Sequence, residues 1–160
     1  MRKLLFILLC LPLIGVGQFL PKDLSGNDVK QCSDGGFVVV SEDGEILKTD
    51  RYGIVLWRKS FSRVLNSVQI CSDGGFIVAG RNESSSSRSK YLNAYLFKTD
   101  RNGNLLWEKK FGGSSYDYAN SVQICSDGGF IVAGTSDANA YLFKTDRNGN
   151  LLWEKKFGGS

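Results

Sequence analysis

The residues that could do chemistry in this chain are limited first by a missing type, because its 160 residues include no histidine. Ser-His-Asp and Cys-His nucleophilic catalysis and histidine-ligated metal sites are therefore excluded. The 16 acidic residues lie mostly in repeated turns and at strand ends, and no unique pair stands out. Glycoside hydrolysis by paired carboxylates stays open as an alternative. We expect a non-catalytic protein with no catalytic residue, no cofactor and no metal site.

Cysteine is the next reactive type. Besides Cys10 near the N-terminus, Cys32, Cys71 and Cys125 occupy the same position in three related segments. An odd number cannot pair fully, and equivalent positions in neighbouring repeats are expected to exceed the ~7 Å between Cα atoms that a disulfide tolerates. We expect each cysteine to be a buried packing residue at the end of a strand. A metal site or a disulfide remains the alternative.

Two segments carry oxygen ligands at the alternate positions that a calcium ion prefers. They are Asp-Arg-Asn-Gly-Asn at residues 100–104 and again at 146–150. An EF-hand loop has its glycine at position six and an acid at position twelve, whereas here the glycine is fourth and no such acid follows. The first repeat has Tyr52 at the second ligand position. The pattern favours a hairpin turn in which the aspartate caps its own backbone.

The N-terminus has the layout of a secretory signal. A basic start, Met1-Arg2-Lys3, precedes an apolar run at residues 4–16, with small residues at Gly15 and Gly17. The run is shorter than the roughly 20 residues that span a bilayer, and no other segment is long and apolar enough. We expect a signal peptide at residues 1–17 and a secreted or cell-surface chain with no transmembrane segment after cleavage. A lipid anchor on Cys10 and a retained membrane anchor are less favoured alternatives.

The charge of the expected mature chain is nearly balanced. Cleavage removes Arg2 and Lys3 and leaves 18 basic and 16 acidic side chains. This small, well-mixed excess does not form a nucleic-acid footprint, so no nucleic-acid partner is expected.

Internal repetition decides the fold class. Residues 67–80 recur unchanged at 121–134, and residues 93–114 recur unchanged at 139–160. A divergent first copy covers residues 29–40 and 46–57. In the third unit the pattern predicts strands at 121–125, 130–134, 140–145 and 151–157. Asp-Gly and Asn-Gly turns separate the first strand from the second and the third from the fourth. No helix is expected after the signal.

These blocks resemble known repeats. Gly-Gly-Phe-Ile-Val-Ala-Gly and Phe-Lys-Thr-Asp-Arg-Asn-Gly-Asn-Leu-Leu-Trp-Glu-Lys-Lys-Phe-Gly-Gly are similar to the β-propeller repeats of secreted Bacteroidetes surface proteins, which are associated with type IX secretion. The second block also resembles the tryptophan-docking blades of quinoprotein-like propellers. The resemblance implies an all-β chain whose three four-stranded antiparallel blades form a partial, open propeller. Its blades cover about residues 28–61, 66–114 and 120–160 of a repeat domain at 18–160.

The three tryptophans, Trp57, Trp107 and Trp153, have the same place in every unit. An aromatic ligand platform is one interpretation of this placement. Residues that are repeated in every unit more often pack one unit against the next. We therefore expect the tryptophans to pack between blades.

Three blades are fewer than the four to eight of a closed propeller. The simplest interpretation is a truncated piece of a longer array. An open stack, or two chains pairing to give six blades, are the alternatives. Apolar faces left open at the outer blades lead us to expect self-association. A fragment of a larger propeller enzyme, quinoprotein-like or glycan-active, and a truncated reading frame without its own function also remain alternatives.

Variation between the units points to binding residues. Because strands alternate in direction, the connections from second to third strand and from one unit to the next share one end of each blade, and these connections differ between units. Variable loops on a rigid scaffold commonly bind partners, here a glycan or a protein, although a solvated loop with no partner at residues 84–87 is an alternative. The candidate binding residues are Arg81, Asn82, Glu83, Arg88, Lys90, Tyr91, Tyr116, Asp117, Tyr118, Ser136 and Asp137.

Export should remove the first 17 residues, because Gly15 and Gly17 fit the positions that signal peptidase reads. Intact-mass measurement of exported protein is expected to show a chain that begins at Gln18. An exported chain that starts at Met1, or that carries lipid on Cys10, contradicts this prediction.

Overall fold

The computed structural model describes residues 25–82 and 91–158, whose regular structure is entirely β-strand. The expected signal peptide and the candidate residues Glu83, Arg88 and Lys90 lie outside these ranges. The strands are β1 (Gly26–Gln31), β2 (Phe37–Ser41), β3 (Glu45–Thr49), β4 (Val55–Ser60), β5 (Arg63–Ile70), β6 (Phe76–Asn82), β7 (Ala94–Thr99), β8 (Leu105–Phe111), β9 (Asp117–Ile124), β10 (Phe130–Ser136), β11 (Asn139–Thr145) and β12 (Leu151–Phe157).

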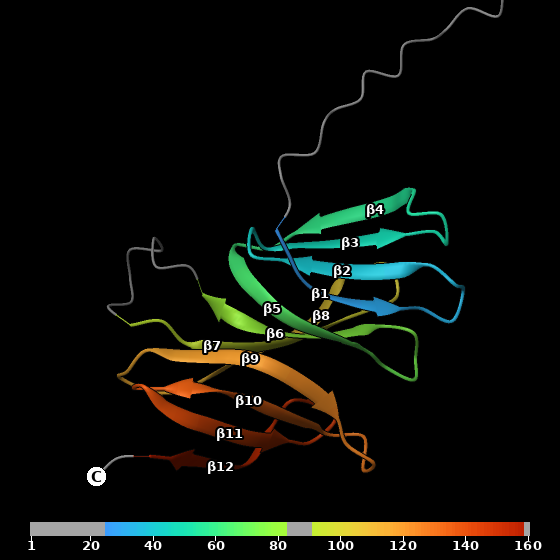
Figure 1. The fold of residues 1–160 in the computed structure, drawn as a ribbon. Coiled ribbons are helices and arrows are strands. Elements are labelled where there is room, and N and C mark those ends of the chain that lie inside the picture. Colours follow the sequence, from blue (N-terminus) through green and yellow to red (C-terminus); the bar gives the residue numbers. More distant parts are fainter. Residues whose placement is uncertain (1–24, 83–90, 159–160) are drawn as a thin grey trace, which may run out of the picture.

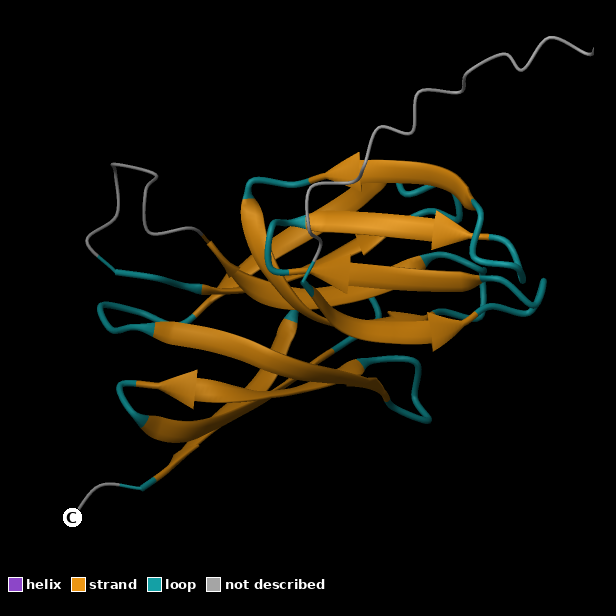
Figure 2. Cartoon of the chain, turned by 45° about the horizontal axis from the view of Figure 1, so that its top comes forward, coloured by secondary structure: helices purple, strands orange, loops and turns teal. Residues whose placement is uncertain are grey.

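The strands form three four-stranded sheets, each antiparallel and each in sequence order. We call β1–β4 blade 1, β5–β8 blade 2 and β9–β12 blade 3. Figure 1 shows the blades following one another along the chain, and Figure 2 shows that the stack is open. The first strands of successive blades, β1, β5 and β9, lie side by side. The predicted all-β fold of three four-stranded antiparallel blades is confirmed.

Strand bounds in blade 3 match the prediction at its last strand and differ at its first. β12 covers the predicted residues 151–157, but β9 begins at Asp117 instead of residue 121. β10 runs on to Ser136, and only Asp137 and Ala138 remain as a turn, both with positive φ. A bulge in the register near Ala133 lets the two strands pair beyond the predicted end.

The predicted turns are present in each blade. In blade 2 the amide of Gly74 donates to the carbonyl of Cys71, and Asp73 accepts from Gly75. In the later turn, Asp100 Oδ1 accepts from the amides of Asn102 and Asn104. This aspartate caps its own hairpin, which is the turn that the sequence favoured over a calcium loop.

Apolar side chains form two clusters, one at each junction between successive blades. The alternating residues of β6 are divided between them: Phe76 and Val78 face blade 1, while Ile77 and Ala79 face blade 3. The middle blade is therefore buried on both faces. The blade 1–2 cluster is Val38, Val40, Ile46, Leu65, Val68, Phe76, Val78 and Phe97. The blade 2–3 cluster is Ile77, Ala79, Ala94, Leu96, Phe111, Ala119, Val122, Phe130, Val132, Tyr141 and Phe143.

A tryptophan docks at each junction, as the sequence predicted. Trp107 of β8 lies 6.0 Å from the ring of Phe130 in blade 3. It also covers Gly149, where an added Cβ would lie 2.6 Å from the ring. Trp57 makes the same contacts with Phe76 and Gly103 of blade 2. Only glycine leaves room for the indole here, and it also accepts the positive φ of the turn.

Two further contacts repeat at the junctions. The last aromatic residue of each blade packs on the third strand of the next, with ring centroids 4.8 Å apart for Phe61 and Phe97 and 4.3 Å apart for Phe111 and Phe143. An asparagine also donates from the first strand of one blade to a carbonyl on the first strand of the next. Asn27 donates to the carbonyl of Leu65 at 2.8 Å, and Asn66 donates to that of Ala119 at 2.9 Å.

Substituting the glycine under the tryptophan should destabilise the fold more than substituting a glycine with the same φ in open space. Gly149 and Gly128 have φ of 77° and 79°, and a Cβ on Gly128 meets nothing within 4 Å. Gly128→Ala should cost about 1–2 kcal/mol of backbone strain. Gly149→Ala should cost a further 1–3 kcal/mol, roughly, because the indole must move.

Urea unfolding followed by circular dichroism measures both free energies. Equal losses of stability in the two variants would show that tryptophan docking does not hold the junction.

Candidate functional site

The two ends of the blades differ in structure. Since each sheet is antiparallel and in sequence order, the β1–β2, β3–β4 and equivalent turns lie at one end, here called the turn end. The connections β2–β3, β4–β5 and their equivalents lie at the other, called the loop end (Figures 1 and 2). The candidate binding residues predicted from the sequence that the structure describes are at the loop end of blades 2 and 3.

Four of these residues gather in what we call the tyrosine cluster: Arg81, Tyr91, Tyr116 and Tyr118. The rings of Tyr91 and Tyr116 meet edge to face at 5.9 Å between centroids. The guanidinium of Arg81, on β6, lies 5.4 Å from the centre of the Tyr118 ring, on β9. Tyr116 is 50% exposed. The strands β6 and β9 thus carry Arg81 and Tyr118, and the connections before β7 and β9 carry Tyr91 and Tyr116, at the loop end of two blades.

Hydrogen bonds hold the connections that carry this cluster. The amide of Asn82 donates to the carbonyl of Asn93 at 3.2 Å, and the amide of Asn93 donates back to Asn82 Oδ1. The amide of Asp117 donates to the carbonyl of Leu92 at 2.9 Å, which ties blade 3 to blade 2. These hydrogen bonds tie the described backbone on either side of the tyrosine cluster to neighbouring segments.

Several candidate residues lie in strands and not in connections, which corrects the sequence interpretation. Arg81 and Asn82 belong to β6, Asp117 and Tyr118 to β9, and Ser136 to β10. Asp137 is in the two-residue turn, is exposed, and donates its amide to the carbonyl of Tyr116 at 3.2 Å.

Asp117 and Ser136 are fully buried, so they do not belong to a binding surface. They are paired across β9 and β10. Asp117 Oδ2 accepts from the amide of Gly113 at 2.9 Å and so closes the connection from blade 2. Asp117 Oδ1 and Ser136 Oγ have no hydrogen-bond partner among the described residues.

Blade 2 has an arginine, Arg63, at the position of its first strand that Asp117 occupies in blade 3. Arg63, which pairs with Asn82 in β6, forms an ion pair with Glu108 at 2.5 Å, and its guanidinium lies 4.4 Å from the centre of the Tyr95 ring. In blade 3 the hydroxyl of the equivalent tyrosine, Tyr141, donates directly to Glu154. Burial, and then this hydrogen bond, raise the pKa of Tyr141. Blades 2 and 3, which share long unchanged blocks of sequence, therefore differ from each other at the loop end.

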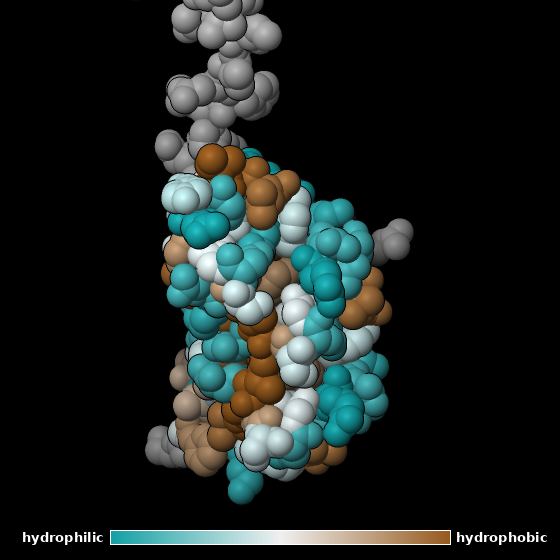
Figure 3. Space-filling view, turned by 90° about the vertical axis from the view of Figure 1, so that its right-hand side faces the viewer, coloured by the Kyte–Doolittle hydropathy of each residue, from teal (hydrophilic) through white to brown (hydrophobic). Residues whose placement is uncertain are grey.

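The turn end holds two equivalent pockets that the sequence did not reveal. One, of about 540 Å3, lies between blades 2 and 3, and the other, of about 510 Å3, between blades 1 and 2. Both volumes are in the range of small-molecule sites. Figure 3 looks at this end and shows hydrophobic surface gathered between hydrophilic side chains. Both pockets are lined by a cysteine, serines, a lysine and a tryptophan, by an aspartate, a glycine, an arginine and an asparagine of the turns, and by a leucine, an isoleucine and a phenylalanine.

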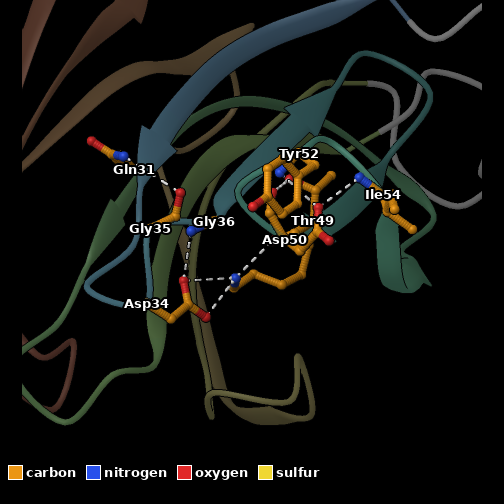
Figure 4. A network of polar contacts seen from close by, with 9 residues as sticks. Gln31, Asp34, Gly35, Gly36, Thr49, Asp50, Tyr52 and Ile54 are labelled. Atoms are coloured by element: carbon orange, nitrogen blue, oxygen red, sulfur yellow. Dashed lines mark hydrogen bonds and ion pairs between the residues drawn. The ribbon is translucent and has the colours of Figure 1, made fainter.

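Each pocket is lined by a lysine that forms an ion pair within its own blade. Lys48 Nζ lies 2.9 Å from Asp34 and donates to the carbonyl of Thr49. Figure 4 shows Asp34, Gly36 and Thr49 close together in this polar network. The hydrogen bond from Lys48, and then that from the amide of Gly36, lower the pKa of Asp34. Lys98 pairs with Asp73 in the same way in blade 2. Both lysines therefore form ion pairs with aspartates of the turns.

The cysteines are less deeply buried than the sequence predicted, although Cys32 and Cys71 do pack against the two apolar clusters. Cys32, Cys71 and Cys125 are free thiols, but each is half-buried and lies just beyond the end of a strand. Cys71 and Cys32 line the two pockets. Burial raises the pKa of Cys32, and it raises the pKa of Cys71 to about 11.

Metal sites and membrane-spanning helices are two further features that bear on function. Residues 25–82 and 91–158 contain no group of three His, Cys, Asp or Glu side chains placed to hold a metal ion. The same residues include no helix with the length and apolar character needed to cross a membrane.

The raised pKa of Cys71 should make it slow to react. With a pKa of about 11 against 9.0 for a free thiol, native Cys71 has roughly one hundredth of the thiolate of the unfolded chain at pH 8. Labelling by a thiol reagent, followed at this residue by mass spectrometry, should speed up strongly in denaturant and as the pH approaches 11. Native labelling as fast as in denaturant would contradict the burial of this thiol.

No protein-family model and no curated protein matches this sequence. Solved structures do match the fold. A protein of unknown function from Bacteroides caccae aligns with a TM-score of 0.62 and 16% sequence identity, over 87% of this chain and 48% of that one. The WD40 β-propeller domain of Doa1 aligns with a TM-score of 0.54 and 21% identity, over 75% of this chain and 36% of that one.

This chain therefore spans less than half of the length of either structure. At these identities the likeness concerns the fold alone. Three four-stranded antiparallel blades in sequence order, joined by repeated junctions, align with the blades of a known propeller. The chain has a β-propeller fold, present here as an open array of three blades.

Proposed function

We propose that this chain is an exported, non-catalytic binding module that contacts a protein partner through the tyrosine cluster. Export is supported by the leader pattern at residues 1–17. The observation that carries the binding proposal is the convergence of Arg81, Tyr91, Tyr116 and Tyr118 from two blades at the loop end.

Residue chemistry supports a protein partner. Tyrosine and arginine are enriched among the residues that dominate binding energy in protein interfaces. The backbone hydrogen bonds that Asp117 donates to Leu92 and that Asp137 donates to Tyr116 hold the connections of the cluster, which lowers the entropy lost on binding. A glycan fits less well, because Asp117 and Ser136, which could have bound sugar hydroxyls, are buried inside the blade.

Matched substitutions test the proposal. Tyr116→Ala and Arg81→Ala remove members of the cluster. Tyr52→Ala removes an exposed tyrosine at the turn end, whose ring also lies near an arginine, Arg51, at 5.4 Å. The probes are a random-peptide phage library and a glycan array, applied to the immobilised exported chain.

The library should yield peptides that bind the parent chain. Their binding should weaken about tenfold or more in Tyr116→Ala and in Arg81→Ala, and should be unchanged in Tyr52→Ala. Selective glycan binding with the same mutational pattern would replace the protein partner by a glycan. Peptide binding indifferent to both cluster substitutions would overturn the proposal.

A further inference from the structure

The two faces of each blade are chemically different. We call the face that carries the docking tryptophan the donor face, and the face that carries the turn glycine the acceptor face. At the two junctions the donor face of one blade packs on the acceptor face of the next. The donor face of blade 3 and the acceptor face of blade 1 have no blade against them among the described residues.

Blade 3 presents the same donor residues that blade 2 uses. Trp153 and Phe157 repeat Trp107 and Phe111 in an unchanged block of sequence. Trp153 is 39% and Phe157 53% exposed, whereas Phe111 is 6% exposed. Asn120 and Ser121 are exposed and repeat Asn66 and Ser67. Asn66 donates to the carbonyl of Ala119 in blade 3, and Ser67 Oγ accepts from the amide of Val122 in the same blade. The donor face of blade 3 is thus complete and open.

Blade 1 presents the matching acceptor residues. Gly53 has φ of 82° and is exposed, and a Cβ there meets nothing within 4 Å, in contrast to the covered Gly103 and Gly149. Phe37 and Leu47 stand where blade 2 has Phe76 and Phe97. Val29 is 54% exposed at the place of the buried Val68.

Blade 1 also has room for a neighbour. Gly26 stands where blade 2 has Leu65 and leaves an apolar hollow of about 250 Å3, lined by residues 26–29 and Val39. The carbonyl of Gly26 corresponds to the carbonyl of Leu65, which accepts a hydrogen bond from Asn27. Lys155 repeats Lys59, which reaches Asn104 in the turn of the next blade at 3.2 Å. At the open face Ile54 stands in the place of Asn104, so this hydrogen bond is not repeated there. The same turn begins at Asp50, the equivalent of Asp100, whose carboxylate interacts with the charge of Lys59 at the existing junction.

We propose that the open donor face of blade 3 docks on the open acceptor face of blade 1 of a second copy of this chain. The new junction repeats the two already present, with Trp153 over Gly53 and Phe157 against Leu47. Two such contacts, related by a two-fold axis, close two three-blade arrays into a six-blade ring. Six blades lie within the range of closed propellers.

Sedimentation velocity of the exported chain at micromolar concentration should show a dimer. Trp153→Ala and Gly53→Ala should each weaken dimerisation about tenfold or more. Gly128→Ala is the matched control for Gly53, since it has the same φ and open space but faces blade 2. Leu151→Ala, on the strand of Trp153 but beside the groove with blade 2, is the control for the tryptophan. Both controls should dimerise like the parent chain.

Mixing the Trp153→Ala and Gly53→Ala variants distinguishes this arrangement from a dimer in which two like faces meet. Trp153→Ala keeps its acceptor face and Gly53→Ala keeps its donor face, so an equimolar mixture can form one unaltered junction that neither variant can form alone. The mixture should therefore contain more dimer than either variant at the same total concentration. Circular dichroism like that of the parent chain shows that each variant is folded.

A monomeric parent chain, a ladder of larger assemblies, dimerisation unaffected by Gly53→Ala, or a mixture with no gain in dimer would each overturn the proposal. These substitutions leave the tyrosine cluster unaltered, so peptide binding and assembly are tested independently.

Discussion

The contact on which the rest of the structure depends is an indole ring lying over a glycine of the neighbouring blade. Trp107 meets Gly149 so closely that a single added carbon would lie within 2.8 Å of two ring atoms. This contact sets the separation and the tilt of two sheets that could not bury their apolar faces alone. The pockets of the turn end are the space that remains beside the docked rings. The tyrosine cluster depends on the same contact, because its members belong to two different blades.

Much of the fold could be predicted because the repeats are nearly identical. Turn glycines, alternating apolar residues and the tryptophan positions are local signals, and they gave the strands, the hairpins and the docking. The start of β9 could not be predicted in this way. Its first residue, Asp117, pairs with Ser136 across a register bulge and bonds to Leu92 of another blade. Partners distant in sequence decided that boundary, and with it the burial of two residues expected at the surface.

The candidate site was predictable in its location but not in its composition. Alternating strand direction correctly placed the variable connections at one end, and Tyr116 and Asp137 are exposed there. The pairing of Arg81 with Tyr118 joins strands of two blades, so no spacing within either blade indicated it. The pockets could not be predicted for another reason: their lining residues are repeated in every unit, as structural residues are, and the hollows arise only where the turns of two blades face each other.

Identical sequence does not produce identical surroundings in this stack. Ile77 is fully buried between blades, whereas Ile131, in the same block of blade 3, is only half-buried. The difference comes from the neighbouring blade: blade 3 covers the donor face of blade 2, whereas no blade among the described residues covers the donor face of blade 3. Orientation matters as well, because the donor face needs a glycine under its indole and a second donor face offers none. A blade is therefore completed only by a neighbour in the same orientation, and stacking of like faces leaves both indoles without the backbone contact that the two existing junctions share. The turn glycine, which has no side chain, thus specifies which face of one blade packs on which face of the next.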